Sequence, residues 1–244
     1  DDIRALVARA GEAFGGIDIV VNNAANALTQ PLGSFTPEAW QKSFDVNLRG
    51  PVFLVQSALP HLERSEHASV VNVISAGAFL FSAGVAMYAA AKAALMAFTR
   101  SMAAEYAALG VRVNALAPGT VDTDMVRASS LEAQAAMARA SVQGRAAHPD
   151  EMVGPVVFLA SDASSYVTGM SSAVACASGT KVSRCPSATW NGSGSDPIRM
   201  RGPWRSPRIA TGMPSASASA RTCAMVCACC ACVPWEKLIR VTLT

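Results

Sequence analysis

Tyr88 and Lys92 are residues whose types and spacing can do chemistry in this 244-residue chain. They lie four positions apart in the alanine-rich stretch VAMYAAAKAAL (85–95), so on a helix their side chains share one face, about 5 to 6 Å apart. A phenol with an ordinary pKa of about 10 is a poor base at neutral pH, and lowering that pKa to about 7 needs roughly 4 kcal/mol of differential stabilisation. A cation one turn away favours the phenolate. The pair predicts a tyrosine that exchanges a proton with a substrate hydroxyl or carbonyl.

The same spacing also arises by chance on alanine-rich helices, and two further polar residues favour the chemical interpretation. Ser75 follows the β-branched run SVVNVI (69–74), where a hydroxyl at a strand end can orient a substrate oxygen. Asn47 lies within FDVNLRG, inside a predicted helix, although an amide side chain is an indifferent helix former. We therefore expect these four polar groups to act together.

The elements that must position these residues alternate along the chain. The runs 17–21, 69–74 and 111–117 are typical of strands buried on both faces. Between them, Thr36 and Pro37 predict a helix start, Pro51 predicts a kink or a restart of that helix, and Gly110 ends a long helix over 85–108. A further helix is expected from His148-Pro149-Asp150. This rhythm predicts an α/β fold with a doubly wound parallel sheet and helices on both faces.

Charge and composition divide the chain near residue 175. Residues 1–174 carry 11 Lys or Arg and 15 Asp or Glu, whereas residues 175–244 carry 9 and 2, together with all seven cysteines. The second region is rich in Ser, Pro, Gly and Arg and has no sustained periodicity. We therefore expect a folded domain over 1–174 and a region of little regular structure over 175–244.

The first region resembles the classical short-chain dehydrogenase/reductase family. That family carries an Asn, then a Ser, then Tyr-x-x-x-Lys, which here are Asn47, Ser75, Tyr88 and Lys92. Three more segments agree in order, namely DIVVNNAA (18–25), VRVNALAPGTVDTDM (111–125) and FLASDASSYVTGM (158–170). The resemblance implies that Tyr88 is the general acid/base and that Lys92 lowers its pKa and binds the nicotinamide ribose. It further implies that Ser75 polarises the substrate carbonyl and that Asn47 holds a proton-relaying water.

The resemblance also implies a nicotinamide cofactor, NAD or NADP. Beside Tyr88 and Lys92, the implied cofactor-binding residues lie in the two segments that follow the first and third predicted strands, and they are Asn22, Ala24, Pro118, Gly119, Val121 and Thr123. Hydride transfer is the chemistry of the cofactor, and the protein positions and protonates the substrate.

Two departures from the family pattern stand out. The family opens with a strand and a glycine-rich turn that cradles the pyrophosphate, and this chain begins at what resembles the helix before the fourth strand. The glycines of GEAFGG (11–16) precede a strand, so we interpret them as a helix end and a loop. The segment that separates NAD from NADP is therefore missing, the sheet should have an exposed edge, and a catalytically inactive remnant is the alternative to an enzyme.

The second departure is the region after residue 174, where AVACASGTKVSRC replaces the family's usual Val-Asp-Gly-Gly ending. Its composition suggests a frameshift product, which the encoding DNA can test. Six of its cysteines (185, 223, 227, 229, 230 and 232) offer soft-metal ligands, but without the paired spacing of zinc modules, so we predict no metal site. Its scattered arginines give weak grounds for a nucleic-acid partner, and we predict none.

The sequence thus predicts an NAD(P)-dependent oxidoreductase that interconverts a small-molecule alcohol and a carbonyl. The loop 76–86 is apolar, which favours a hydrophobic or alicyclic substrate or, equally, ordinary core packing. Small residues on helices 37–60 and 85–108 fit the homo-oligomers of the family, an expectation that the missing segment weakens. No run of 18 apolar residues and no signal peptide precedes the domain, so we predict a cytoplasmic protein without a membrane partner.

Overall fold

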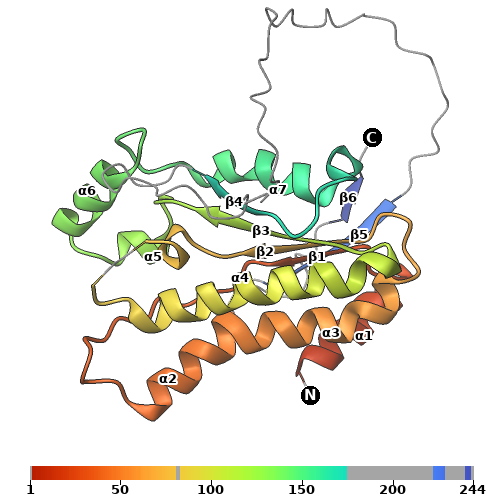
Figure 1. Ribbon diagram of the computed structural model, residues 1–244, viewed down its shortest axis with the longest axis horizontal. Coiled ribbons are helices and arrows are strands. Elements are labelled where there is room, and N and C mark those ends of the chain that lie inside the picture. The colour runs from red at the N-terminus through yellow and green to blue at the C-terminus, as the bar shows by residue number, and fades with distance from the viewer. Residues whose placement is uncertain (1, 81–82, 175–221, 229–239, 243–244) are drawn as a thin grey trace, which may run out of the picture. The chain divides into compact units, whose positions relative to one another are not determined.

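The computed structural model describes residues 2–80, 83–174, 222–228 and 240–242 and is centred on a mostly parallel β-sheet (Figure 1). Its strands run in the order β4, β3, β2, β1, β5, β6. The first four strands pair in parallel, each with its neighbour, and are β1 (Ile19–Asn22), β2 (Ser69–Val73), β3 (Arg112–Pro118) and β4 (Ser171–Val174). The predicted doubly wound α/β class is therefore confirmed.

Helices connect these strands and cover both faces of the sheet (Figure 1). In the described residues the α-helices are α1 (Asp2–Phe14), α2 (Pro37–Phe44), α3 (Gly50–Leu62), α4 (Ala86–Tyr106), α5 (Asp124–Arg127), α6 (Leu131–Ala140) and α7 (Val153–Ala160). Shorter turns of other helix types are η1 (Asp45–Arg49), η2 (Ala76–Ala78), η3 (Ala107–Leu109), η4 (Pro149–Met152) and η5 (Asp162–Ser164).

The helix starts and stops follow the residues that predicted them. Thr36 caps α2 by accepting a hydrogen bond from the Ala39 amide at 3.2 Å. Gly110 ends the segment after α4 with φ +75°, a left-handed conformation that glycine adopts without a steric penalty. His148 begins η4 in a capping box with Glu151, and α7 follows directly.

Pro51 restarts the helix through a wider turn. Five residues of η1 form a π-helix between α2 and α3, and the Gly50 amide donates to the Asp45 carbonyl. Proline has no amide hydrogen and is tolerated in the first turn of a helix, which is where Pro51 lies in α3. The expected restart at Pro51 thus takes the form of a π-turn.

The core forms two layers because side chains alternate between the faces of each strand. Val20, Val70 and Val113 face one side, where they pack in one cluster with side chains of α1, α3 and α4. Ile19, Val21 and Val71 face the other side, where they pack with Leu159 and Ala160 of α7. Burying a valine or leucine side chain stabilises the fold by about 1.5 to 3 kcal/mol, so these layers fix the helices against the sheet.

Two strands come from the region that was expected to be irregular. β5 (Thr222–Ala228) pairs in parallel with β1, and β6 (Arg240–Thr242) pairs antiparallel with β5. The composition of this region did not predict either strand. The rest of that region, including Cys185, Cys229, Cys230 and Cys232, lies outside the described residues.

Candidate functional site

Ser75, Tyr88 and Lys92 lie together at the end of β2 and the start of α4. Ser75 follows β2 and caps η2, where its Oγ accepts a hydrogen bond from the Gly77 amide at 3.1 Å. Tyr88 and Lys92 occupy the first two turns of α4, and the Lys92 Nζ lies 5.8 Å from the centroid of the Tyr88 ring. The chain thus brings a hydroxyl, a phenol and an ammonium to one place, as the motif predicts.

Lys92 is a buried cation, with 1% of its surface exposed. Its Nζ donates a hydrogen bond to the carbonyl oxygen of Val73, the last residue of β2, at 2.8 Å. A buried ammonium needs such partners, because losing its hydration without compensation would cost several kcal/mol. This bond ties α4 to the end of β2 and fixes the position of Lys92 beside Tyr88.

The electrostatics of Tyr88 differ from the sequence expectation. Burial raises the pKa of the Tyr88 phenol above its ordinary value of 10.0, and a side-chain hydrogen bond with Ser75 lowers it by less. The spacing of Tyr88 and Lys92 predicted a lowered pKa instead. The difference arises because the ammonium faces the ring and bonds the Val73 carbonyl, while the phenol sits in a drier environment.

Asn47 lies in the π-turn η1, fully buried, and its amide holds the loop that follows β1. Its Nδ2 donates to the carbonyl oxygens of Asn26 and Ser43, both at 2.9 Å. Its Oδ1 accepts from the Asn26 amide at 3.2 Å. Asn26 was not among the predicted site residues, because no pattern in the sequence relates it to Asn47.

The π-turn η1, which holds Asn47, packs against α4, the helix that carries Tyr88 and Lys92. A π-turn leaves its carbonyls outside the regular α-helical pattern, and such turns recur at functional sites. The role of Asn47 as holder of a water stays a prediction.

Asn22 and Ala24, the expected cofactor residues after β1, differ in exposure. Asn22 is buried, and its Nδ2 donates to the Asn72 Oδ1 at 2.7 Å, whereas Ala24 is partly exposed in the loop. The Asn72 Nδ2 in turn donates to the Thr99 Oγ1 of α4 at 2.9 Å. This chain of side-chain bonds connects β1, β2 and α4, and no pattern in the sequence predicted it.

The segment after β3 carries the other expected cofactor residues, Pro118, Gly119, Val121 and Thr123. Pro118 ends β3, and Val121 pairs with Ala147 in an isolated parallel bridge. Thr123 precedes α5, and its Oγ1 donates to the Val121 carbonyl oxygen at 3.4 Å. The bridge from Val121 to Ala147 therefore fixes this segment to the residues that precede η4.

Parallel pairing places the carboxyl ends of these strands side by side. Asn22 lies opposite Asn72 in the register, and Val73 lies opposite Leu116. The three segments that follow β1, β2 and β3 therefore all leave the sheet at the carboxyl ends of its strands, which is where open α/β sheets bind ligands. Ala24, Ser75 and Gly119 follow these three strand ends.

The donors present fit the nicotinamide end of a dinucleotide. Ser75 and Tyr88 carry hydroxyls, and Lys92 carries an ammonium with three N–H donors, a set suited to ribose hydroxyls and a carbonyl oxygen. For the pyrophosphate, none of β1, β2 and β3 is followed by a turn with three closely spaced glycines. Gly15, with φ +80°, lies between α1 and β1, which confirms the interpretation of GEAFGG as a helix end.

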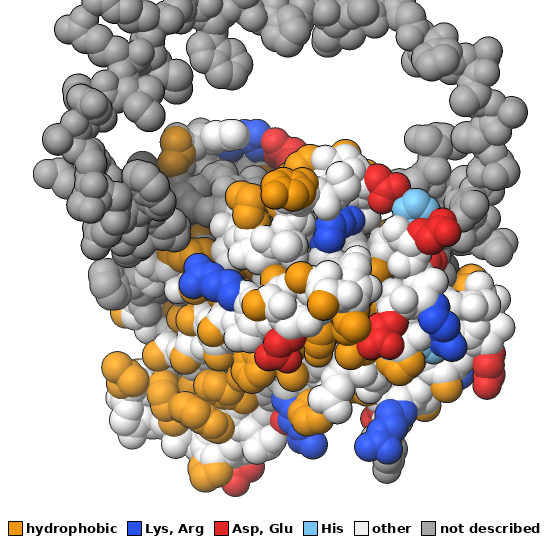
Figure 2. Space-filling view, turned by 45° about the vertical axis from the view of Figure 1, so that its right-hand side comes forward, with side chains coloured by type: hydrophobic (Ala, Val, Ile, Leu, Met, Phe, Trp, Pro, Cys, Tyr) orange, Lys and Arg blue, Asp and Glu red, His pale blue; other side chains and the backbone are white. Residues whose placement is uncertain are grey.

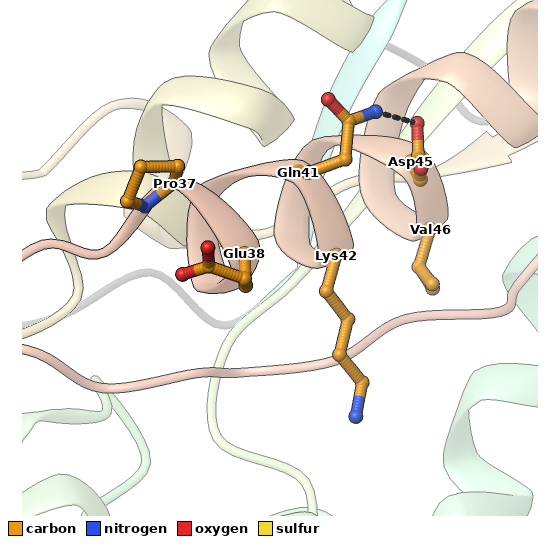
Figure 3. A pocket seen from close by; sticks show the side chains of 6 residues that line it. All are labelled: Pro37, Glu38, Gln41, Lys42, Asp45 and Val46. Carbon is orange, nitrogen blue, oxygen red and sulfur yellow. Dashed lines mark hydrogen bonds between the residues drawn. The ribbon is translucent and has the colours of Figure 1, made fainter.

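A separate surface hollow of about 640 Å³ lies along α2 and η1 (Figure 3). Within it, the Gln41 Nε2 donates to the Asp45 Oδ1 at 2.7 Å. None of the residues expected to act in catalysis lines it, so the hollow is distinct from the site around Tyr88. Its lining residues are Pro37, Glu38, Gln41, Lys42, Asp45 and Val46.

Two absences hold for the part of the chain that the structure describes. Within it, no three His, Cys, Asp or Glu side chains are grouped so that they could hold a metal ion. None of the helices placed there has the length and apolar character needed to cross a membrane.

Comparisons with known proteins agree with this geometry. A family model described as enoyl-(acyl carrier protein) reductase matches residues 1–176. The chain is 39% identical over 170 residues to the cis-4-hydroxycyclohexanecarboxylate dehydrogenase of Sinomonas cyclohexanicum, covering 69% of this chain and 68% of that protein. It is 38% identical over 180 residues to a short chain dehydrogenase/reductase of Aspergillus oryzae, covering 71% and 69%.

A solved structure extends the agreement to the fold. The crystal structure of a gluconate 5-dehydrogenase from Burkholderia cenocepacia in complex with NADP and tartrate superposes with a TM-score of 0.67 at 33% identity. The match covers 70% of this chain and 68% of that one. With the family match, the curated relatives and the site geometry in agreement, the chain belongs to the short-chain dehydrogenase/reductase family of oxidoreductases.

Proposed function

We propose that this protein interconverts an alcohol and a carbonyl by NAD(P)-dependent hydride transfer, with Tyr88 as the general acid/base. The observation that carries the proposal is the grouping of Ser75, Tyr88 and Lys92 at the carboxyl edge of a parallel sheet. The cofactor, when bound, supplies or accepts the hydride at the substrate carbon. Every other part of the chemistry belongs to side chains of this chain.

The raised pKa of Tyr88 concerns the form in which the phenol starts the proposed reaction. A phenol with a raised pKa stays protonated at neutral pH, so in the reductive direction it can donate a proton to a developing alkoxide. Ser75 hydrogen-bonds Tyr88 and can also bond the substrate oxygen, which orients that oxygen toward the phenol. Lys92 stabilises the phenolate that remains after the proton has left.

A small apolar or alicyclic ketone is the proposed substrate class. The segment after Ser75 contributes Ala76, Ala78, Phe79 and Leu80, and Phe79 is 44% exposed. This apolar segment follows the hydroxyl that bonds Tyr88 and packs against α4, so it suits a ring or a short hydrocarbon. The relative that acts on a hydroxycyclohexane carboxylate is named for an alicyclic substrate.

The test is a nicotinamide absorbance assay of the purified full chain with NADH, NADPH and a cyclic ketone. Activity in the natural chain that falls about 100-fold to 10,000-fold in Tyr88→Phe supports the proposal, since general acid catalysis contributes rate factors of that order. Equal turnover by the two proteins would contradict the role of Tyr88. Cofactor fluorescence measured in parallel separates failed binding from failed chemistry.

A second candidate function is a non-catalytic remnant of the fold. It is favoured by the described strands β1, β2 and β3, none of which is followed by a turn with three closely spaced glycines. Absence of cofactor binding by the full chain, with binding gained when the relatives' additional segment is fused to it, would support the remnant.

We propose that the surface formed by α2, α3 and α4 joins copies of this chain into a homo-oligomer. Trp40, Phe53 and Phe98 lie on these helices and are 44 to 46% exposed, and Trp40 stacks on Phe44 with ring centroids 4.4 Å apart. Figure 2 shows hydrophobic side chains gathered on the lower part of one face. Light scattering of the natural chain and of Phe53→Ser measures the mass of each assembly. A mass of one chain for both proteins would contradict the homo-oligomer.

A further inference from the structure

A row of three buried polar side chains, Asn22, Asn72 and Thr99, connects β1, β2 and α4. The Asn22 Nδ2 donates to the Asn72 Oδ1 at 2.7 Å, and the Asn72 Nδ2 donates to the Thr99 Oγ1 at 2.9 Å. The exposed fraction is 2% for Asn22 and 0% for the other two. The Thr99 hydroxyl donates in turn to the Leu95 carbonyl oxygen at 2.8 Å. Because Asn22 occupies the Oδ1 of Asn72, the amide of Asn72 is held with its Nδ2 toward α4.

The contact surface between α4 and the sheet is built from small side chains. Leu95 is the one buried residue of α4 between Lys92 and Thr99, and it packs in one cluster with Ala115 and Ala117 of β3. Apolar groups of this size fit together at many relative positions of helix and strand, because burial of apolar surface has no preferred direction. A buried hydrogen bond is directional and is lost when its partners move apart. The polar contacts of α4 therefore determine its position more sharply than its apolar contacts do.

These polar contacts join α4 to β2 at two points. The Lys92 Nζ donates to the Val73 carbonyl oxygen at 2.8 Å, and the Thr99 Oγ1 accepts from Asn72, which precedes Val73 in the strand. Lys92 and Thr99 are seven residues apart, so they lie on one face of α4 and about 10 Å apart along its axis. Together the two points fix the rotation of α4 and its position along β2. Lys92 belongs to the proposed site, so Thr99 is the attachment outside that site.

The same face of α4 carries Tyr88, eleven residues or about three turns before Thr99. On the strand side, Ser75 follows Asn72 by three residues. A shift of α4 along β2 would therefore move the Tyr88 phenol relative to the Ser75 hydroxyl, with which it shares a hydrogen bond. We propose that Asn72 and Thr99 are positioning residues, whose hydrogen bond sets the place of α4 on β2 and so holds the Tyr88 phenol at Ser75. The catalytic consequence rests on the proposed function, whereas the placement of Tyr88 does not.

Substitutions at Thr99 test this role with little change in the volume of the core. Thr99→Val keeps the shape of the side chain and removes the hydroxyl, whereas Thr99→Ser keeps the hydroxyl and should behave as the natural chain does. Ser69→Ala is the matched control. Ser69 is equally buried on β2, but its hydroxyl donates to the Leu159 carbonyl oxygen of α7, at 2.9 Å. Thr99→Val and Ser69→Ala thus each remove one buried hydrogen bond between β2 and a helix, and only the first of these helices carries Tyr88.

The first readout needs no enzyme activity. It is the carbon-13 NMR signal of the Tyr88 Cζ in the full chain, labelled at its three tyrosines and assigned with Tyr88→Phe. Thr99→Val should shift this signal, and Ser69→Ala and Thr99→Ser should leave it in place. Asn72→Ala removes the same bond from the strand side and should also shift it. An unmoved signal in Thr99→Val and Asn72→Ala would overturn the proposal, and so would an equal shift in Ser69→Ala.

The second readout is the nicotinamide absorbance assay. The kcat of Thr99→Val should fall about tenfold to 100-fold with little change in the KM for the cofactor, since a misplacement of about 1 Å costs rate factors of that order. Thr99→Ser and Ser69→Ala should keep the natural kcat. Equal kcat values in Thr99→Val and the natural chain would overturn the proposal. A natural chain without turnover would contradict the proposed function alone, because the Tyr88 signal still decides whether Thr99 positions the phenol.

Discussion

The Nζ atom of Lys92 lies 5.8 Å from the centre of the Tyr88 ring and donates a hydrogen bond at 2.8 Å to the Val73 carbonyl. The ammonium is thus held beside the phenol by the end of β2. Burial dominates the pKa of Tyr88 and raises it. The protonated phenol is the form that the proposed reduction of a carbonyl requires.

Replacement of Tyr88 by Phe should change the alkaline stability as well as the activity. A group whose folded pKa is raised contributes stability that is full below its unfolded pKa of 10.0 and is lost as the pH rises through the folded pKa. The free energy of unfolding of the natural chain should therefore fall above pH 10 more steeply than that of Tyr88→Phe. Denaturant titrations across this range measure both slopes, and equal slopes would show that Tyr88 is not buried.

Arg112 should be a large single contributor to stability. Its guanidinium bonds the carbonyls of Leu159 and Ser161 and the Ser164 hydroxyl, at 2.9, 3.2 and 2.6 Å, and so closes the end of α7 on β3. Arg112→Ala should lower the free energy of unfolding by on the order of 3 kcal/mol, because several buried acceptors lose a charged donor.

Arg127→Ala is the matched control for that experiment. Arg127 makes exposed ion pairs with Asp122 and Asp124, at 2.9 and 3.4 Å, and pairs of this kind contribute about 0 to 1 kcal/mol. Equal losses for the two arginines, measured by urea unfolding, would show that the contacts of Arg112 are not specific.

Glu151 should make the start of η4 sensitive to acid. Hydrogen bonds from Arg145 and the His148 amide lower its pKa from 4.5 to about 2. A depressed folded pKa contributes stability that is present above pH 4.5 and is lost as the pH falls through about 2. The local stability of residues 145–152, followed by hydrogen exchange, should decline in this window in the natural chain. In Glu151→Gln the local stability of these residues should already be lower at neutral pH, and it should vary less with pH.

A side chain at Gly11 should require the His61 ring of α3 to move. A Cβ atom at Gly11 would lie 2.7 Å from the Cε1 of His61, whereas a Cβ at Gly16 would meet nothing within 4 Å. Gly11→Ala should destabilise the fold by at most about 1 kcal/mol, because the higher helix propensity of alanine offsets part of the cost of moving the His61 ring, and Gly16→Ala should be close to neutral. The double variant with His61→Ala should recover part of the loss, and thermal unfolding of the set measures this.

Much of the fold was predictable because local signals agreed with the tertiary structure. Thr36, Pro37 and Gly110 mark helix ends by their own backbone and hydrogen-bonding preferences, and the valine-rich runs became the buried strands. The grouping of Ser75 with Tyr88 followed from one strand end and one helical turn. Features of this kind depend on neighbours in the sequence.

The remaining features depend on contacts between distant segments. The pairing of Asn47 with Asn26 and the bonds from Asn22 through Asn72 to Thr99 are side-chain contacts across elements, which periodicity does not encode. The direction of the Tyr88 pKa shift required knowing how dry its surroundings are. β5 was missed because its pairing with β1 joins residues near opposite ends of the chain.

The π-turn at Asp45–Arg49 also sets the rotational phase between two helices. Each residue of an α-helix advances the chain by about 100°, so a single deletion within this turn would rotate α2 by roughly that angle relative to α3. Trp40 and Phe44 would then swing off their present side, and Asn47 would lose Asn26. The extra residue therefore fixes the rotation of α2 relative to α3, so that Trp40 and Phe44 face one set of neighbours and Asn47 faces another.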